Sequence, residues 1–314
     1  MTQWIKVLVG CATSGKSNFA KKYQKQAVIL SSDAIRMELY GALEQTNHTE
    51  VFNLMFQRLI KNVKTGHNIV YDATNRNRRQ RIALYTTVKK INPQIKFIIE
   101  FFHQPYAQLI RNNWQRPKIK QVPPIALFQQ YLSLDVPRGG VDCDEFRLHT
   151  PSFEVYQSEI WAPSYFESHF SPWHQESIAE HIEKTIILAK KTGDEELIKL
   201  ASYHDLGKTI ARQPKKLKTA NDQETRAKLD RWDVYYNHEK VSACYALIAG
   251  LDLNVVELIF QHSTFPLTKK QKRRHQITDQ MVKQLSRFKE IDGQAQTRNI
   301  EDMQTLFTTT SATK

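Results

Sequence analysis

Apolar and polar residues follow different patterns in the two halves of the chain. In the first half, short apolar runs rich in β-branched and aromatic residues predict strands at residues 5–9, 27–30, 68–72 and 94–102. Segments with apolar residues at helical spacing accompany these runs near residues 17–25, 50–65, 77–91 and 105–115. This alternation predicts an α/β domain in which helices flank a parallel sheet.

Beyond about residue 165 the strand pattern ends. Apolar residues recur there at helical spacing in four segments, 178–191, 195–203, 239–249 and 254–261, which predicts an all-α domain. A chain of 314 residues is long for one core, so we expect two domains, at residues 1–150 and 165–314. Turn-forming residues between Pro137 and Pro163 mark the expected join.

The formal net charge of the chain is +13. Lysine and arginine displace counterions from phosphates, so this charge favours a polyanionic partner, although a basic surface without such a partner is the alternative. Two basic segments, 214–231 and 269–275, are predicted to be surface loops. The second is the better candidate for a nucleic-acid patch, unless it is simply a solvated face.

Cysteine usage indicates the compartment. The three cysteines, Cys11, Cys143 and Cys244, form neither a Cys-x-x-Cys pair nor an even-numbered framework, which fits a reducing environment. The N-terminal residues do not have the pattern of a secretory signal, and no apolar run approaches the length of a membrane span. We therefore expect a cytoplasmic protein.

Residues 10–17 read Gly-Cys-Ala-Thr-Ser-Gly-Lys-Ser and match the complete phosphate-binding loop G-x-x-x-x-G-K-S. They lie between the first predicted strand and the first predicted helix, which is the context this motif needs. The loop predicts ATP as phosphate donor, with Lys16 at its outer phosphates and the Ser17 hydroxyl on Mg²⁺. The other predicted contacts in the loop are Gly10, Thr13, Ser14 and Gly15.

A carboxylate and a guanidinium, those of Asp33 and Arg36, follow the second predicted strand at helical spacing. The carboxyl end of a parallel strand faces the crevice in which α/β sheets bind ligands. There Asp33 could accept the proton of an attacking hydroxyl, and Arg36 could bind an acceptor phosphate as a bidentate fork.

Further arginines lie along the rest of the first half. The turn after the third predicted strand reads Asp72-Ala73-Thr74-Asn75, and four arginines follow it: Arg76, Arg78, Arg79 and Arg81. A later basic helix leads from Arg111 to Arg116. Each arginine alone is typical of a solvated surface, but together, after a phosphate loop, they predict a lid that clamps phosphates.

Residues 1 to about 150 resemble the 5′-hydroxyl polynucleotide kinase family of phage and bacterial RNA repair. The resemblance is based on the P-loop, the Asp33-x-x-Arg36 pair, the Asp72-x-Thr74-Asn75 turn and the lid helix. The resemblance implies that Asp33 is the general base toward a 5′-OH. It implies acceptor contacts by Arg36, Asp72, Thr74 and Asn75. It also implies that Arg116 neutralises the transferred phosphoryl group with support from Arg111. The two arginines are five residues apart where the family pattern has four, so which of them contacts the phosphate stays open.

Seven of the eleven histidines lie beyond residue 160. His204 and Asp205 form a doublet at the end of a predicted helix, followed by Gly207 and Lys208. Neighbours on an ideal helix diverge by about 100°, so both side chains could face one ion only where the helix ends. Imidazoles and carboxylates spread over a helical bundle are typical of a divalent-metal site.

This pattern resembles the HD-domain phosphohydrolases over roughly residues 165–300. The resemblance implies a two-metal site that Asp205 bridges, occupied by a divalent transition metal such as Mn²⁺, Fe²⁺, Co²⁺, Ni²⁺ or Zn²⁺. It implies six ligands: His181, His204, Asp205, His238, His262 and Asp292. Lys208 could offset charge on the leaving phosphate, and His174 could add a contact to substrate or metal.

Together the two resemblances imply an enzyme that heals broken RNA. It would phosphorylate 5′-OH ends and remove 2′,3′-cyclic or terminal 3′ (or 2′) phosphates, preparing ends for an RNA ligase; tRNA and DNA are open alternatives as substrates. A second interpretation makes the substrates small, as in a nucleoside or metabolite kinase joined to a nucleotidase. A third, a nucleic-acid-binding protein with inactive sites, is disfavoured by the presence of Lys16, Asp33 and His204.

Overall fold

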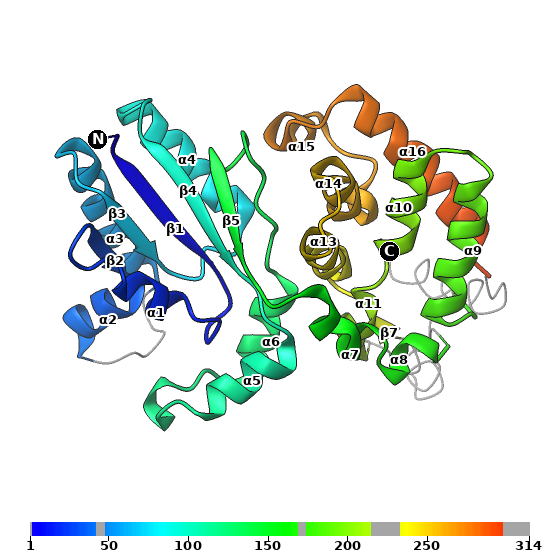
Figure 1. Cartoon of the computed structure of the whole chain (residues 1–314), viewed down its shortest axis with the longest axis horizontal. Coiled ribbons are helices and arrows are strands. Elements are labelled where there is room, and N and C mark those ends of the chain that lie inside the picture. The colour runs from blue at the N-terminus through cyan, green and yellow to red at the C-terminus, as the bar shows by residue number, and fades with distance from the viewer. Residues whose placement is uncertain (1, 42–47, 169–173, 215–232, 298–314) are drawn as a thin grey trace, which may run out of the picture. The chain divides into compact units, whose positions relative to one another are not determined.

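The computed structural model describes residues 2–41, 48–168, 174–214 and 233–297. The chain divides into two compact units, Met1–Pro151 and Ser152–Lys314. Figure 1 shows a sheet with flanking helices in the first unit and mainly helices in the second.

Five parallel strands form the sheet of the N-terminal unit, in the order β2-β3-β1-β4-β5. They are β1 (Trp4–Gly10), β2 (Val28–Ser31), β3 (Ile69–Asp72), β4 (Lys96–Phe102) and β5 (Glu145–His149). Consecutive residues of a strand point to opposite faces, and all residues of β1 from Ile5 to Gly10 are buried, so both faces of the sheet are covered. The prediction of a parallel sheet with flanking helices is confirmed.

β5 is absent from the predicted strands. Its residues lie at the edge of the sheet, are partly or fully exposed, and contain no run of apolar residues. The burial signal on which strand prediction depends is therefore missing there.

The helices described in this unit match most of the predicted segments. They are α1 (Lys16–Lys21), α2 (Ser32–Tyr40), α3 (His48–Lys64), α4 (Arg78–Ile91), α5 (Tyr106–Trp114) and α6 (Pro124–Leu132), with a 3₁₀ turn η1 (Lys118–Lys120). α1 ends four residues earlier than predicted, and α6 was not predicted. α2 begins where the Ser31 hydroxyl accepts a hydrogen bond from the Ala34 N–H (3.4 Å), and it ends at Gly41, whose φ of 64° favours glycine.

Most of the described C-terminal unit is helical. Its helices are α7 (Gln157–Ile160), α8 (Pro163–Phe166), α9 (Ile178–Lys190), α10 (Glu195–Tyr203), α11 (Lys208–Ala211), α13 (His238–Ile248), α14 (Leu253–Gln261), α15 (Lys269–His275) and α16 (Asp279–Ala295), with 3₁₀ turns η2 (Phe153–Tyr156) and η3 (His262–Thr264). α10 packs against α9, α13, α14 and α16, and buries Leu197 and Leu200. No helix among the described residues has the length and apolarity needed to cross a membrane.

Two features of this unit differ from prediction. A short antiparallel pair, β6 (Gln213–Pro214) with β7 (Asp233–Val234), interrupts the helices, so the unit is not all-α. The basic segment 269–275 is helix α15 and not a loop, because Thr268 and Gln271 cap its first turn with reciprocal hydrogen bonds of 3.2 and 2.8 Å. The other predicted basic loop lies outside the described residues from position 215 to 231.

Candidate functional site

The loop between β1 and α1 has the backbone of a phosphate-binding loop. Gly10 has φ 152°, and a Cβ atom there would lie 2.4 Å from the carbonyl oxygen of Phe102, so no larger residue fits. Gly15 (φ 99°) and Thr13 (φ 66°) also have positive φ values. A chain curled in this way ahead of a helix can bind phosphate through its backbone N–H groups.

Two polar side chains of the loop are buried and fit a phosphate ligand. Lys16 donates from Nζ to the carbonyl oxygens of Gly10 (2.9 Å) and Cys11 (2.6 Å). Burial lowers the pKa of Lys16, although Asp72 opposes this effect. The Ser14 hydroxyl is buried without a partner among the described residues. The negatively charged oxygens of a phosphate could accept hydrogen bonds from both the Lys16 ammonium and the Ser14 hydroxyl.

Asp72 lies at the end of β3, next to the P-loop. Burial raises the pKa of Asp72, whereas Lys16 and a hydrogen bond from Ser17 lower it. Asp72 is therefore beside the hydroxyl predicted to ligate Mg²⁺, as well as being a predicted acceptor contact. A carboxylate and a loop hydroxyl together could hold Mg²⁺, an ion that prefers oxygen ligands.

Asp33 and Arg36 form an ion pair at the start of α2. Arg36 Nη1 lies 2.9 Å from Asp33 Oδ1, and Arg36 Nη2 lies 3.4 Å from His48 Nδ1. Arg36 Nε is buried without a hydrogen-bond partner among the described residues. Asp33 lies close enough to Lys16 to affect its pKa. The carboxylate could therefore meet an acceptor hydroxyl near the donor phosphates, and the guanidinium could take a further acceptor oxygen.

Two arginines predicted for the phosphate lid are structural instead. Arg78 and Arg81 are each 1% exposed. Arg81 Nε donates to Asp142 (2.8 Å), and Arg78 Nε donates to the carbonyl oxygen of Val136 (3.0 Å). The charge of Arg81 is paired with Asp142, and both side chains are buried against the segment before β5, so the structure does not support the predicted place of these two arginines in an exposed lid.

The helix predicted to form the lid is joined to the P-loop. The Thr13 hydroxyl donates to the carbonyl oxygen of Leu109 (3.0 Å), and the Asn112 amide donates to the carbonyl oxygen of Thr13 (3.1 Å). Arg111 is exposed and bonds Gln108 on its own helix. Arg116 is partly buried, and its positive charge contributes to lowering the pKa of Lys16. Of the two arginines, Arg116 is therefore the one whose charge acts on the P-loop lysine.

The predicted acceptor residues Thr74 and Asn75 contact the loop backbone. The carbonyl oxygen of Thr74 accepts a hydrogen bond from the Gly10 N–H (3.0 Å). The Asn75 amide, at φ 45°, donates to the carbonyl oxygen of Leu8 (2.8 Å). Both residues therefore form hydrogen bonds to the end of β1. The sequence pattern alone did not indicate this structural role.

In the C-terminal unit, four histidines from different elements direct their Nε2 atoms toward Asp205. His181 belongs to α9, His204 follows α10, His238 begins α13 and His262 follows α14. His204 Nδ1 lies 2.9 Å from the carbonyl oxygen of Ala201, and His238 and His262 contact the carbonyl oxygens of Tyr235 and Ile259, both at 2.7 Å. When Nδ1 donates its proton in this way, Nε2 keeps a lone pair that can bind a metal ion.

Asp205 offers one oxygen to each half of this cluster. Oδ2 lies 3.3 Å from His204 Nε2 and 3.6 Å from His181 Nε2, whereas Oδ1 lies 3.2 Å from His238 Nε2 and 3.8 Å from His262 Nε2. The doublet can share a site because the helix ends at Tyr203. Asp205 is therefore placed as a bridge between two groups.

The remaining predicted residues complete these groups. Asp292 Oδ1 lies 2.9 Å from His181 Nε2, and Lys208 Nζ lies 2.6 Å from Asp205 Oδ2. Burial lowers the pKa of His204, but the carboxylates of Asp205 and Asp292 outweigh burial and raise it to about 10. The cluster thus strongly attracts positive charge, and its imidazole and carboxylate donors fit divalent transition metals. Two candidate metal groups consist only of predicted ligands: His181, His204 and Asp292, and Asp205, His238 and His262. A third is formed by His174, Glu176 and His181.

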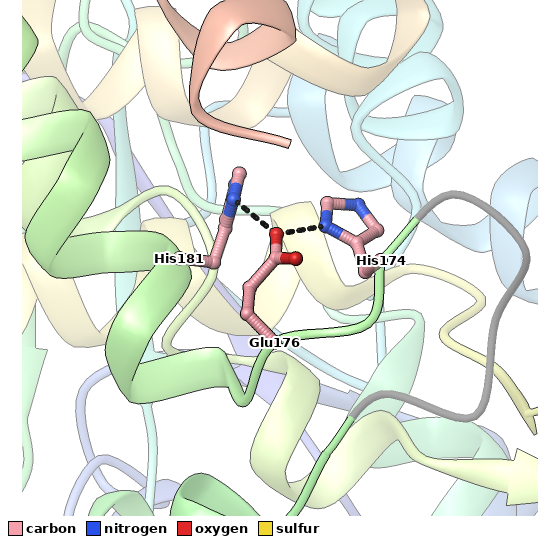
Figure 2. Close-up of side chains that lie close together, drawn as sticks. All are labelled: His174, Glu176 and His181. Atoms are coloured by element: carbon pink, nitrogen blue, oxygen red, sulfur yellow. Dashed lines mark hydrogen bonds and ion pairs between the residues drawn. The ribbon is translucent and has the colours of Figure 1, made fainter. Parts of the chain in front are cut away.

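One residue beside this cluster was missed by the sequence analysis. Glu176 lies between His174 and His181, as Figure 2 shows, with Oε1 at 3.0 and 3.3 Å from their Nδ1 atoms. A glutamate five residues before a predicted ligand carries no recognisable spacing signal, because the chain between them turns into α9.

Comparisons with known proteins bear on the N-terminal unit. A family model described as "AAA domain" matches residues 5–135. No curated protein matches the chain. Similar solved structures include a gluconokinase from Sinorhizobium meliloti 1021 (19% identity, 46% of this chain, 81% of that chain, TM-score 0.33). A sugar kinase from Janibacter sp. HTCC2649 is also similar (13%, 48%, 86% and 0.35), as is a chain of the Pnkp1/Rnl/Hen1 RNA repair complex (23%, 42%, 44% and 0.36).

The family match and the loop geometry concern the same part of the chain. The matched residues contain the glycine-dependent loop after β1, the buried Lys16 and the end of β3. Residues 5–135 are therefore similar to an AAA domain and contain a phosphate-binding loop.

Proposed function

We propose that this chain is a bifunctional RNA end-healing enzyme. Its N-terminal unit transfers the γ-phosphate of ATP to 5′-OH ends, and its C-terminal unit, as an HD-type phosphohydrolase, removes 2′,3′-cyclic or terminal 3′ (or 2′) phosphates. The proposal is supported by two clusters of polar side chains in separate units of one chain. One is the P-loop with the Asp33–Arg36 pair, and the other is the histidine cluster around Asp205.

In the kinase unit, bound ATP and Mg²⁺ supply the phosphoryl group and neutralise part of its charge. Lys16 exchanges its loop carbonyl acceptors for phosphate oxygens. Asp33 accepts the proton of the attacking 5′-hydroxyl, while Arg36 holds the acceptor through its buried guanidinium. Arg116 adds positive charge on the donor side.

In the phosphohydrolase unit, bound divalent ions supply positive charge at the phosphate and activate water at neutral pH. Asp205, with one oxygen toward each group, would be a ligand to the ion held by either group. Lys208, next to Asp205, offsets negative charge on the phosphate that leaves. His174, at the edge of the cluster, contacts substrate.

RNA is supported as the substrate by charge. The net charge of +13 and the basic helix α15 suit a polyanion better than a small metabolite. The products of the two reactions, a 5′-phosphate and a 3′-hydroxyl, are the ends that a ligase joins, so we propose an RNA ligase as the next enzyme on the same RNA.

The direct test uses an RNA oligonucleotide with a 5′-OH and a 2′,3′-cyclic phosphate, incubated with γ-labelled ATP. Analysis of both termini should show label at the 5′ end and loss of phosphate at the 3′ end. Matched DNA and a free nucleoside, offered at equal concentration, separate a polynucleotide kinase from a small-molecule kinase. Labelling of the nucleoside in preference to RNA would overturn the proposal.

A further inference from the structure

The carboxylate of Glu176 is buried between two histidines. Its Oε1 lies 3.0 Å from His174 Nδ1 and 3.3 Å from His181 Nδ1, and Figure 2 shows the carboxylate between the two rings. An ionised carboxylate only accepts hydrogen bonds, so it favours a proton on the Nδ1 atom that faces it. His174 Nδ1 is hydrogen-bonded to Oε1, and His181 Nδ1 faces the same oxygen at ion-pair distance.

The consequence for His181 is an assigned tautomer. With Nδ1 protonated toward Glu176, the lone pair of His181 is on Nε2, which lies 2.9 Å from Asp292 and 3.4 Å from His204 Nε2. A histidine held on one nitrogen by a carboxylate is also a more basic ligand on the other.

The second carboxylate oxygen of Glu176, Oε2, binds the backbone next to the helix that carries Asp292. Oε2 accepts hydrogen bonds from the N–H of Gln175 (3.2 Å) and of Thr297 (3.1 Å), and the Gln175 N–H donates to the carbonyl oxygen of Thr297 (2.9 Å). Thr297 follows α16, the helix that carries Asp292. Glu176 thus connects the start of α9 with the end of α16, the two elements that bring His181 and Asp292 together.

From this geometry we propose that Glu176 is a positioning residue for one of the two metal groups, the one formed by His181, His204 and Asp292. The inference rests on the proposed function of the C-terminal unit. The other group does not depend on Glu176, because His238 and His262 are held by backbone carbonyl oxygens. Loss of Glu176 should therefore weaken one metal position and spare the other.

The experiment measures metal stoichiometry and affinity in the full-length protein. Purified wild type, stripped with chelator and titrated with Mn²⁺, should bind two equivalents. E176Q keeps the shape of the side chain but cannot accept from all its donors, so one equivalent should remain and the second should bind ten- to a hundredfold more weakly. Electron paramagnetic resonance should report loss of the signal from coupled Mn²⁺ pairs.

Controls separate positioning from folding. E180Q alters a carboxylate of α9 that caps the first turn of that helix, and this variant should retain two equivalents. ATP-dependent 5′ phosphorylation should be unchanged in E176Q. T297P removes one donor to Oε2 and leaves the carboxylate in place; Gln296 has φ −71° and ψ 131°, which a following proline accepts. If E176Q does not fold, T297P should still weaken the second equivalent.

Three results would overturn the inference. Two equivalents of unchanged affinity in E176Q would show that Glu176 positions nothing. Three equivalents in wild type, with one lost in both E176Q and H174N, would make Glu176 a metal ligand itself. Weakening of both equivalents to the same extent would indicate a general structural role. By contrast, a wild type that binds no transition metal would refute the phosphohydrolase proposal, so the two failures are distinguishable.

Discussion

Asp33 and Arg36 are joined at 2.9 Å, yet 59% of the Asp33 side chain is exposed and only 8% of the Arg36 side chain is. An exposed carboxylate can meet an incoming hydroxyl and pass its proton to water. A buried guanidinium binds an anion more strongly than an exposed one, because water competes less. Replacement of Asp33 and replacement of Arg36 should therefore have different effects on the kinetics of 5′ phosphorylation.

Replacement of Asp33 or Lys16 by alanine should abolish 5′ phosphorylation. D33A removes the proposed base and K16A removes charge at the phosphates, so the turnover number for RNA should fall at least about a hundredfold. Release of 3′ phosphate from the same preparation should remain near wild type. Loss of both activities in a folded variant would contradict the assignment of the two reactions to separate units.

Replacement of Arg36 should act mainly on the acceptor. In R36A the KM for RNA should rise about tenfold or more, while the KM for ATP changes little, because a charge-assisted hydrogen bond to the acceptor is lost. R58A is the matched control, since Arg58 pairs with the exposed Glu38 (2.7 Å) on neighbouring helices. An effect confined to the KM for ATP would move Arg36 to the donor site.

The histidine cluster should be needed for 3′-end processing and for bound transition metal. H204A and D205A should release no phosphate and should retain kinase activity. After treatment with chelator, Mg²⁺ alone should restore phosphorylation but restore phosphate release poorly, because imidazole-rich sites favour softer ions. Metal analysis of wild type and D205A gives the check. Equally low metal in both, with full 3′-end activity in wild type, would refute the metal site.

Arg81 should matter for stability and not for phosphate binding. Its pair with Asp142 is buried, so R81M leaves an uncompensated carboxylate and should cost about 3–5 kcal/mol. R79M, two positions away on the exposed side of α4, should change stability by less than about 0.5 kcal/mol. Hydrogen exchange of the β1 and β4 peptides in urea measures this for the N-terminal unit. Equal stability of the two variants would show that the Arg81 pair contributes little.

Glu100 should make the N-terminal unit sensitive to acid. Burial raises the pKa of Glu100, but hydrogen bonds from His149 and Lys6 outweigh burial and keep it below the ordinary value of 4.5. The unfolded chain therefore binds the proton at higher pH than the folded protein. The stabilisation is complete above about pH 4.5 and is lost as the pH falls further.

The measurement is the same exchange experiment between pH 3 and 7, at about unit intervals. Wild type should lose stability over the acid part of this range more steeply than E100Q. E195Q, changed at an exposed site of the other unit, should follow wild type. An identical acid slope in E100Q and wild type would show that Glu100 does not carry the effect.

The sequence predicted those parts of the fold that depend on long buried patterns. β1, β3 and β4 are apolar and central, and they were found, whereas β5 at the exposed edge was not. Charge patterns were less informative. The arginines after β3 all look alike in sequence, yet Arg81 is buried on Asp142 while Arg79 is exposed, because only the fold decides which face of α4 meets the segment before β5.

The candidate sites show the same limit. Lys16 and His204 stand in motifs whose spacing is dictated by the chemistry, so sequence can indicate them. Glu176 acts on its neighbours through the path of the chain: it is brought to His181 by the turn into α9 and to Thr297 by the end of α16, more than a hundred residues later. Contacts of this kind leave no local pattern.

The carbonyl oxygens behind His204, His238 and His262 have one further consequence. The carbonyls of Ala201 and Ile259 belong to the last turns of α10 and α14, and that of Tyr235 lies just before α13, so the ring orientations are set when the bundle assembles and not when an ion arrives. An incoming ion would then find side chains whose rotational freedom has already been lost, and its affinity would reflect how completely the bundle is folded. Metal occupancy should therefore report on how completely the C-terminal unit is folded. It should fall in variants with substitutions in the core, such as L200A, even though the substituted residue is not a ligand.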